Sequence, residues 1–213
     1  MAARDVLGLP DGFVWNFGLS PSKRFILIGR QMAKKKSNVQ PKAGAGGGKA
    51  DLLPGKPVSA SRSEMTEVVL PNDANPLGYI LGGRVMHLVD IAGAIAAHRH
   101  SNSHVVTASM DYVDFRNPIK VGELIVLKSS VNRVFHTSME VGVKVFSENV
   151  LTAERKHTSS AYLTFVAIDN ERHPRSIPPL ILKTAAERRR YREAESRRRI
   201  RLAHRYKRPR GNF

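Results

Sequence analysis

The stretch that decides the fold is a long apolar run in the middle of the chain, Gly82-Gly83-Arg84-Val85-Met86-His87-Leu88-Val89-Asp90-Ile91-Ala92-Gly93-Ala94-Ile95-Ala96-Ala97. From Arg84 to about His100 the pattern is helical, and apolar residues lie almost all round the helix. Such a helix has to be buried on most of its sides. It therefore needs an extended surface that wraps around it.

The segments on either side of this helix are typical of strands. One strand is expected before the helix, over 64–70, and four follow it, over 105–115, 124–131, 138–146 and 157–168. Short loops between consecutive strands favour an antiparallel sheet. We therefore expect an α+β fold, with a curved antiparallel sheet wrapped around one long central helix in a hot-dog-like architecture. Edge strands need protection, and pairing of two sheets across a dimer provides it.

The charge of the chain is concentrated at its two ends. The 213 residues carry a net charge of +17, of which 1–62 hold +8, 63–180 hold −1 and 181–213 hold +10. Residues 1–62 combine lysine, glycine, proline and serine without a hydrophobic period, so we expect a disordered basic arm there. One domain is expected over 63–180 and a basic helix and tail over 181–213. A solvated surface explains the basic ends most simply, and weak electrostatic contact with nucleic acid or anionic surfaces is the alternative.

The C-terminal segment carries the signals of an exposed basic helix. Thr184 and Glu187 are spaced as a capping box, which predicts a helix that begins at about Thr184 and ends near Tyr206. Two pairs along it have the spacing of favourable ion pairs within a helix, Glu193 with Arg197 and Glu195 with Arg199.

Several classes of protein are excluded by composition. Without cysteine there is no disulfide scaffold, thiolate metal site or cysteine nucleophile. No apolar run approaches the roughly 20 residues of a membrane-spanning helix. The absence of cysteine fits a cytoplasmic protein, which we expect. The histidines at 98, 100 and 104 do not share one helical face and lack a neighbouring carboxylate cluster, so no metal site is expected.

Three features near the start of the helix predict chemistry. Gly82 and Gly83 immediately precede it, so their backbone N–H groups face outward at its positive end, where they can polarise a carbonyl oxygen. A tight packing turn explains the glycines equally well. Asp90 is costly on an apolar helix unless it is paired or functional, and there it can act as a general base or attack directly. Asn75, before the helix, can position water or a substrate carbonyl.

Helix geometry restricts how these residues cooperate. Gly82 and Asp90 are eight residues apart, so they lie roughly 12 Å apart along one helix. One helix cannot bring both to a single carbonyl group, whereas two antiparallel helices across a two-fold axis can. If both act, the site combines Asn75 and Gly82 of one subunit with Asp90 of another.

These residues belong to a longer set of motifs in the same order. The set comprises Pro71 to Asn75, Gly78, Gly82-Gly83, Met86, Asp90, Ala92 to Ala94, Val106 to Asp111, Phe115, Pro118, Val121 to Glu123, Thr137 to Met139, Glu148-Asn149 and Phe165 to Asp169. Over about 65–180 the chain resembles the acyl-CoA hydrolase branch of the hot-dog thioesterases. The resemblance implies hydrolysis of acyl-CoA to a free fatty or other carboxylic acid and CoA, with Asn75 and Asp90 as catalytic residues from different subunits. It also implies homodimers, often assembled into hexamers as trimers of dimers, and no cofactor, since CoA is part of the substrate.

The phosphates of CoA lead us to expect basic or hydroxyl residues near the mouth of the site. Arg155 and Lys156, before the last strand, are candidates, and a solvated turn is the alternative interpretation. Thr137 and Ser138 either contact CoA or shape a hairpin.

Two other functions compete with hydrolysis. An enoyl-CoA hydratase of the same fold is suggested by Asp73-Ala74-Asn75-Pro76, but Gly78 stands where that enzyme's motif has a catalytic histidine. A noncatalytic module that binds acyl-CoA or nucleic acid is the other alternative. Truncation to 63–180 separates them, because an enzyme survives it and binding by the basic ends does not.

Overall fold

The computed structural model describes residues 53–111 and 113–207, and the predicted N-terminal arm lies mostly outside them. Within this part of the chain no helix is long and apolar enough to cross a membrane. The elements in chain order are β1 (Lys56–Pro57), η1 (Val58–Ser61), β2 (Ser63–Val68), η2 (Pro71–Asp73), α2 (Gly82–Ser101), β3 (His104–Met110), β4 (Leu124–Val134), β5 (Ser138–Glu148), β6 (Arg155–Ile168), β7 (Leu180–Ile181) and α3 (Ala185–Lys207).

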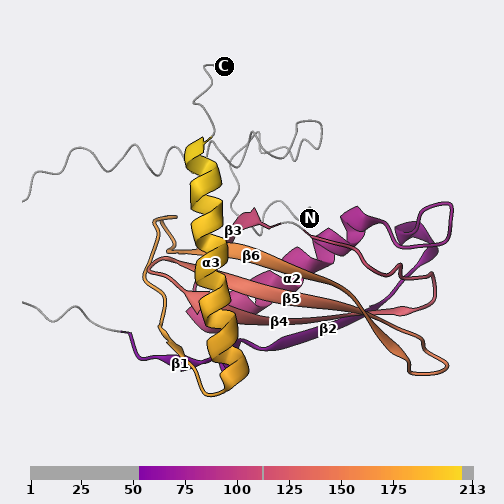
Figure 1. The fold of residues 1–213 in the computed structure, drawn as a ribbon, viewed down its shortest axis with the longest axis horizontal. Helices are drawn as coiled ribbons and strands as arrows, with labels where there is room; N and C mark the ends of the chain where they lie inside the picture. Colours follow the sequence, from indigo (N-terminus) through magenta and orange to yellow (C-terminus); the bar gives the residue numbers. More distant parts are fainter. Residues whose placement is uncertain (1–52, 112, 208–213) are drawn as a thin grey trace, which may run out of the picture. The chain divides into compact units, whose positions relative to one another are not determined.

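Five of the strands form one antiparallel sheet around α2. The strand order is β2-β4-β5-β6-β3, and α2 runs along one face of the sheet (Figure 1). The edges of the sheet are therefore β2 and β3. The predicted α+β hot-dog architecture is confirmed, and within this five-stranded sheet one strand precedes the helix and four follow it.

The core lies between α2 and the face of the sheet that packs against it, which we call the inner face. Alternation along β5 puts Met139, Val141 and Val143 on the inner face, where all three are buried. Gly93 permits close approach of helix and sheet, because a Cβ atom there would lie 3.1 Å from the Phe165 ring. The apolar surface of the central helix is thus buried as its sequence requires.

The predicted strands are all present, but several of their ends differ. The strand expected over 105–115 ends at Met110, whereas β4 continues to Val134 and β6 begins at Arg155. Alternation of side chains identifies the middle of a strand better than its ends, because the last residues depend on the neighbouring strand. β3 has one strand neighbour, β6, and its register with β6 shifts between Thr107 and Ser109.

Ordered elements of the domain precede residue 63, where the domain was expected to begin. β1 pairs with β7, and in η1 both Val58 and Ser61 are buried. The Ser61 hydroxyl accepts a hydrogen bond from the Val131 backbone N–H at 3.0 Å. Residues 56–61 are therefore attached to the sheet.

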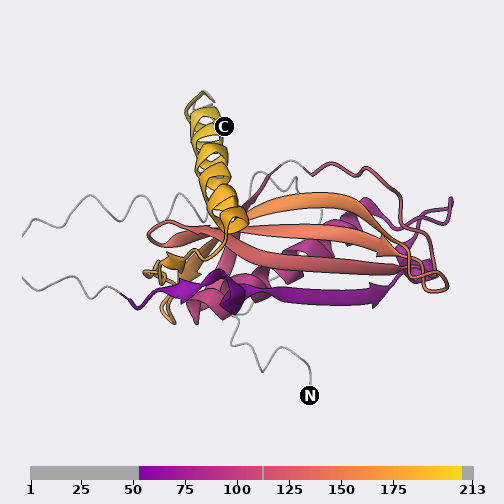
Figure 2. The ribbon, with the colours of Figure 1, turned by 60° about the horizontal axis from the view of Figure 1, so that its bottom comes forward.

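The C-terminal helix lies on the other face of the sheet, which we call the outer face (Figures 1 and 2). Its predicted capping box is present: Glu187 N–H donates to Thr184 Oγ1 at 3.1 Å, and Thr184 N–H donates to Glu187 Oε2 at 3.0 Å. Ala194 is fully buried, while much of the remaining surface of the helix is exposed. The capping box therefore fixes the start of α3, and one stripe of the helix docks on the sheet.

The ion pairs predicted within α3 are replaced by pairs between α3 and the sheet. Arg197 binds Glu140 of β5 at 2.7 Å rather than Glu193, and Glu195 binds Arg133 of β4 at 2.7 Å rather than Arg199. Glu140 lies on the outer face of the sheet and is completely buried. Its carboxylate therefore attracts Arg197 more strongly than the carboxylate of Glu193 does. The basic residues of α3 thus partly serve to dock the helix.

Near the end of α2, the imidazole of His100 is buried, and its Nε2 donates a hydrogen bond to the Pro178 carbonyl oxygen at 2.9 Å. Burial lowers the pKa of His100 below its usual 6.5, and the Lys56 ammonium group adds to this effect, while the bond to Pro178 opposes it. Since a carbonyl oxygen only accepts, Nε2 carries the proton in the neutral ring.

We expect this histidine to make the fold sensitive to mild acid. Because its pKa is lower in the folded chain, the unfolded chain binds more protons below about pH 6.5, so stability falls as the pH drops from that value toward the folded-state pKa. The slope contributed by one such group is at most about 1.4 kcal/mol per pH unit. Denaturant unfolding at several pH values between 7.5 and 5 should show a weaker pH dependence for His100→Asn than for the wild type. Equal slopes in the two proteins would contradict this assignment.

Candidate active site

The first turn of α2 presents free backbone donors. The predicted position of Gly82 and Gly83 needs a small correction, because they are the first two residues of the helix rather than the two before it. Leu81 is the N-cap and provides no side-chain hydrogen bond, so the first N–H groups of the helix keep their donor capacity. Both glycines are exposed, and a Cβ atom at Gly83 would meet nothing within 4 Å in this chain. Packing within the chain therefore does not require glycine at position 83, which favours close approach of another molecule.

The loop before α2 orients Asn75. The side-chain carbonyl Oδ1 of Asn75 accepts hydrogen bonds from the backbone N–H groups of Leu77, at 3.0 Å, and Tyr79, at 3.2 Å. This loop conformation includes Gly78 at a φ of +77°, a region that favours glycine. With Oδ1 engaged, the amide Nδ2 of the half-buried Asn75 is the group that remains to donate to a ligand.

Arg84 holds this loop to the first turn of the helix. Its guanidinium group binds Glu67 of β2 at 2.8 Å and Asp73 of η2 at 3.1 Å. The Leu81 N–H also donates to the Asp73 carbonyl oxygen at 2.8 Å. These contacts fix the position of Asn75 relative to the free N–H groups of the helix.

Asp90 lies two turns further along α2 and has one clear partner. The Thr107 hydroxyl of β3 donates to Asp90 Oδ1 at 2.7 Å, and the carboxylate is half-buried. This bond orients the carboxylate and leaves the other oxygen, Oδ2, able to accept a proton or to attack. Thr107 was not predicted to be a site residue, because threonine is common in strands and its presence in one does not indicate a function.

Within one chain, the Asn75 and Asp90 groups belong to different ends of the site. Asn75 and Gly82 lie at the beginning of α2, whereas Asp90 and Thr107 lie farther along it, roughly 12 Å from Gly82 by helix rise. The separation predicted from the sequence is therefore retained in the structure.

The four candidate CoA-binding residues do not lie together in one chain. Ser138 and Glu148 are the two ends of β5, and Glu148 pairs with Arg155, so the two sets are separated by roughly 33 Å. Arg155 and Lys156 lie at the end of the sheet where α2 begins, since the loop from 71 to 81 bonds to the residues just before β4. Thr137, in the β4–β5 turn, and Ser138, the first residue of β5, lie at the opposite end.

Acidic neighbours already contact the two basic candidates. Arg155 binds Glu148 and Lys156 binds Glu154 at 3.3 Å. Both basic side chains are exposed, so these pairs are weak and can be exchanged for a phosphate group. At Thr137, the backbone carbonyl accepts a hydrogen bond from the Ala167 N–H at 3.0 Å, which agrees with a role in shaping the turn.

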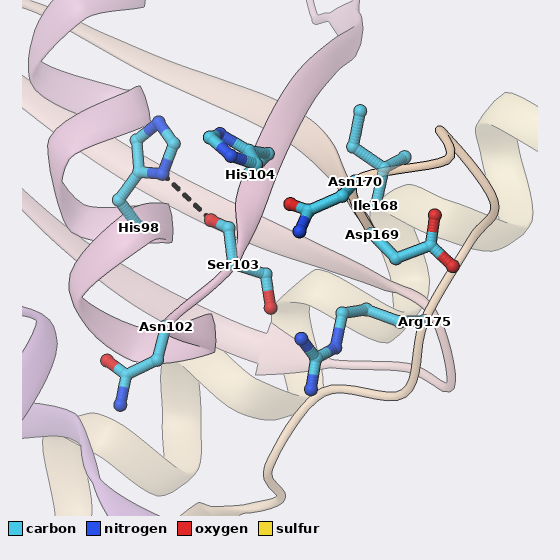
Figure 3. Close-up of a pocket in the computed structure, with 8 residues that line it drawn as sticks. All are labelled: His98, Asn102, Ser103, His104, Ile168, Asp169, Asn170 and Arg175. Atoms are coloured by element: carbon cyan, nitrogen blue, oxygen red, sulfur yellow. Dashed lines mark hydrogen bonds between the residues drawn. The ribbon is translucent and has the colours of Figure 1, made fainter.

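A polar pocket of about 500 Å³ lies at the other end of α2 (Figure 3). His98, His104 and Arg175 contribute to its lining, and His98 Nδ1 is 2.8 Å from the Ser103 carbonyl oxygen. Within residues 53–111 and 113–207, no three His, Cys, Asp or Glu side chains are grouped to hold a metal ion. The pocket belongs to the end of the helix opposite Gly82 and contains neither Asn75 nor Asp90.

Comparison with known proteins identifies the family. Residues 77–154 match the model of the thioesterase superfamily. A solved hexameric acyl-CoA thioesterase is 41% identical, with a TM-score of 0.71, and the match covers 73% of this chain and 100% of that one. This chain belongs to the acyl-CoA thioesterase family of hydrolytic enzymes. Acyl-coenzyme A thioesterase 11 of Mus musculus is 38% identical over 151 residues, which are 70% of this chain but only 25% of the mouse protein.

A second solved relative bears on individual residues. The acyl-CoA hydrolase of Staphylococcus aureus, solved with butyryl-CoA, CoA and CoA disulfide, is 35% identical with a TM-score of 0.68, and the match covers 72% of this chain and 93% of that one. Structures of three single-alanine variants of this hydrolase were also determined, in which an asparagine, an aspartate or a threonine is replaced. These three residues follow one another at intervals of 15 and 17 residues. Asn75, Asp90 and Thr107 follow one another at the same intervals in this chain.

Proposed function

We propose that this chain hydrolyses acyl-CoA thioesters to free carboxylic acids and CoA. The observation that carries the proposal is the half-buried Asp90 carboxylate on α2, oriented by the Thr107 hydroxyl at 2.7 Å. A carboxylate held in this way suits proton abstraction from water or direct attack on a thioester. The free N–H groups at the start of α2 suit the oxygen of the same thioester. Family membership and the spacing of Asn75, Asp90 and Thr107 support this assignment.

In the mechanism, the thioester carbonyl oxygen receives hydrogen bonds from the Gly82 or Gly83 N–H and from Asn75 Nδ2. Asp90 removes a proton from water, the water oxygen attacks the carbonyl carbon, and the carbon–sulfur bond breaks. The departing CoA thiolate takes up the proton. If Asp90 attacks directly instead, an acyl-enzyme anhydride forms and water hydrolyses it in a second step. Apart from these protein groups, the reaction as proposed uses only the substrate and water.

We place each site between two subunits. Asn75 and the glycines of one α2 helix would face Asp90 and Thr107 of an antiparallel α2 helix, because one helix separates these groups by roughly 12 Å. The exposed apolar residues near α2 and β3 fit such a contact, and they include Met86, Ile91, Val106 and Phe115. We expect a homodimer, and the hexameric thioesterase above makes a trimer of dimers the favoured assembly. Arg155 and Lys156, at the end of the sheet where α2 begins, are the candidates for contact with CoA phosphates.

The proposal is tested by the release of CoA from a panel of thioesters with short, medium and long acyl chains. The purified full-length protein should release CoA from at least one class and thereby reveal its chain-length preference. No turnover with any member, from protein shown to be folded and oligomeric, would refute the assignment.

Thr107 provides a more specific prediction. Thr107→Val keeps the shape of the side chain but removes the hydroxyl that donates to Asp90. We expect kcat to fall about 10- to 100-fold with little change in KM, since a hydrogen bond to a charged group is lost. Thr107→Ser, which retains the hydroxyl, should keep most of the activity. Equal losses in the two variants would indicate a packing role instead.

A further inference from the structure

A groove of about 580 Å³ lies on the outer face of the sheet, where α3 covers part of it. Its volume is within the range of small-molecule sites. Four strands contribute to its floor, and α3 contributes Arg190 to its wall. The lining residues are Arg62, Ser63, Glu64, Lys128, Ser129, Ser130, Asn132, Gly142, Val143, Lys144, Ser160, Tyr162 and Arg190.

The groove has an excess of positive charge. Four of its lining residues are basic and one, Glu64, is acidic. The bases come from different segments, with Arg62 before β2, Lys128 on β4, Lys144 on β5 and Arg190 on α3. Segments distant in sequence therefore bring their charges to one place, which differs from a run of basic residues along a helix.

Two of these lysines are placed directly against each other. Lys128 and Lys144 are partners in the β4–β5 register, and like charges in this position are destabilising. Lys128 has a partial compensation in Glu64 at 3.2 Å, whereas the other cross-strand neighbour of Lys144 is Ser160. Within the described residues Lys144 forms no ion pair, whereas the Glu187 carboxylate binds Arg62 at 3.1 Å and attracts Arg190 from a longer distance. An anion in the groove would relieve this repulsion.

Hydroxyl groups complete the donor set of the floor. Ser130, Ser160 and Tyr162 line the groove, and the Tyr162 ring is held beneath the Arg197 guanidinium group at 3.7 Å. Gly142 adds no side chain at this point, and a Cβ atom there would lie 2.7 Å from Asn132 Nδ2. Lysine and arginine with nearby hydroxyl donors are the groups that bind phosphate oxygens well.

We propose that this groove binds a small molecule that carries two or more linked phosphate groups. The ligand would lie across the Lys128–Lys144 pair, with Arg62 and Arg190 on the side of α3. The groove is on the outer face, whereas Asp90 belongs to α2 on the inner face, so the sheet separates the two sites within a subunit. Binding here does not depend on the proposed hydrolysis.

The test is calorimetric titration of the full-length protein with inorganic tripolyphosphate in about 150 mM salt, where long-range attraction is screened. The wild type should bind with a defined stoichiometry of one per subunit. Lys144→Gln and Arg190→Gln should each weaken binding about fivefold, the effect expected from one close charge in water. The matched control is Arg192→Gln, an exposed base on α3 that does not line the groove and should change Kd less than about twofold.

Two results would overturn the proposal. One is the absence of binding by the wild type, and the other is an equal loss in Lys144→Gln and Arg192→Gln, which would mean attraction by overall charge. Lys144 and Arg190 do not belong to the core, and a thermal melt verifies that each variant folds.

A second measurement distinguishes the two sources of linked phosphates. If the phosphates of CoA occupy the groove, CoA competes with tripolyphosphate and KM for an acyl-CoA rises in Lys144→Gln. If a different ligand does, tripolyphosphate binding weakens in the variant while KM stays unchanged. Both outcomes support the site and identify what fills it.

Discussion

Asp90→Asn should lower kcat for the best acyl-CoA substrate by about a thousandfold, the size of effect that follows removal of a general base or nucleophile. Asparagine has nearly the same shape, and its Oδ1 still accepts the hydrogen bond from Thr107, so KM and folding should change little. The measurement is the initial rate of CoA thiol release, together with the thermal melt of both proteins.

A matched control is available in another carboxylate. Glu171 is 82% exposed and lies in the turn after β6, where Asp169 and Asn170 line the pocket at the end of α2 opposite Gly82. Glu171→Gln should retain wild-type activity within about twofold, since surface substitutions of this kind are nearly neutral. If Asp90→Asn were as active as Glu171→Gln, the catalytic role of Asp90 would be wrong. If Asp90→Asn loses activity as expected, single turnover in ¹⁸O-labelled water separates a general base from a nucleophile, because only direct attack places the label in the Asp90 carboxylate.

The second large effect concerns stability. Arg197→Met should destabilise the protein by about 3 kcal/mol, because it leaves the fully buried Glu140 carboxylate without its main partner. Arg201, at 3.5 Å, remains as a weaker partner and keeps the loss near the lower end of the usual range. For a domain of this size, the Tm should fall by roughly 6 to 12 °C.

Two variants make the interpretation of Arg197 specific. Arg192→Met, on the exposed side of α3, should change stability by less than about 0.5 kcal/mol. Adding Glu140→Leu to Arg197→Met should restore much of the loss, since it removes the unpaired buried charge. If the double variant were less stable than Arg197→Met alone, the loss would come from packing of α3 and not from charge.

Local patterns in the sequence predicted much of the fold. The apolar run after Arg84 indicated the central helix, and the alternation along 138–146 indicated the strand against which it packs. Thr184 and Glu187 predicted the start of α3 because a capping box needs only residues three apart. These signals are complete within a few positions of the chain, so they do not depend on the rest of the fold.

Contacts between distant segments were not predictable in the same way. Arg197 was paired with Glu193 from helical spacing, but a buried carboxylate 57 residues away takes it. Thr107 was overlooked because its role depends on α2 and β3 lying side by side. The separation of Gly82 and Asp90, by contrast, follows from the rise of a helix, and the proposal of a site shared between two subunits rests on it.

The central claim is that Asn75 of one subunit and Asp90 of another act on the same thioester. Its most direct test is co-expression of Asn75→Ala and Asp90→Asn chains with different affinity tags, each variant being inactive when alone. The mixed oligomer isolated through both tags should recover activity far above that of either variant, because each dimer that pairs the two variants has one site with both residues intact, and it should approach half of the wild-type rate if every dimer is such a pair. Failure of an isolated, folded mixed oligomer to recover activity would contradict a site shared between subunits.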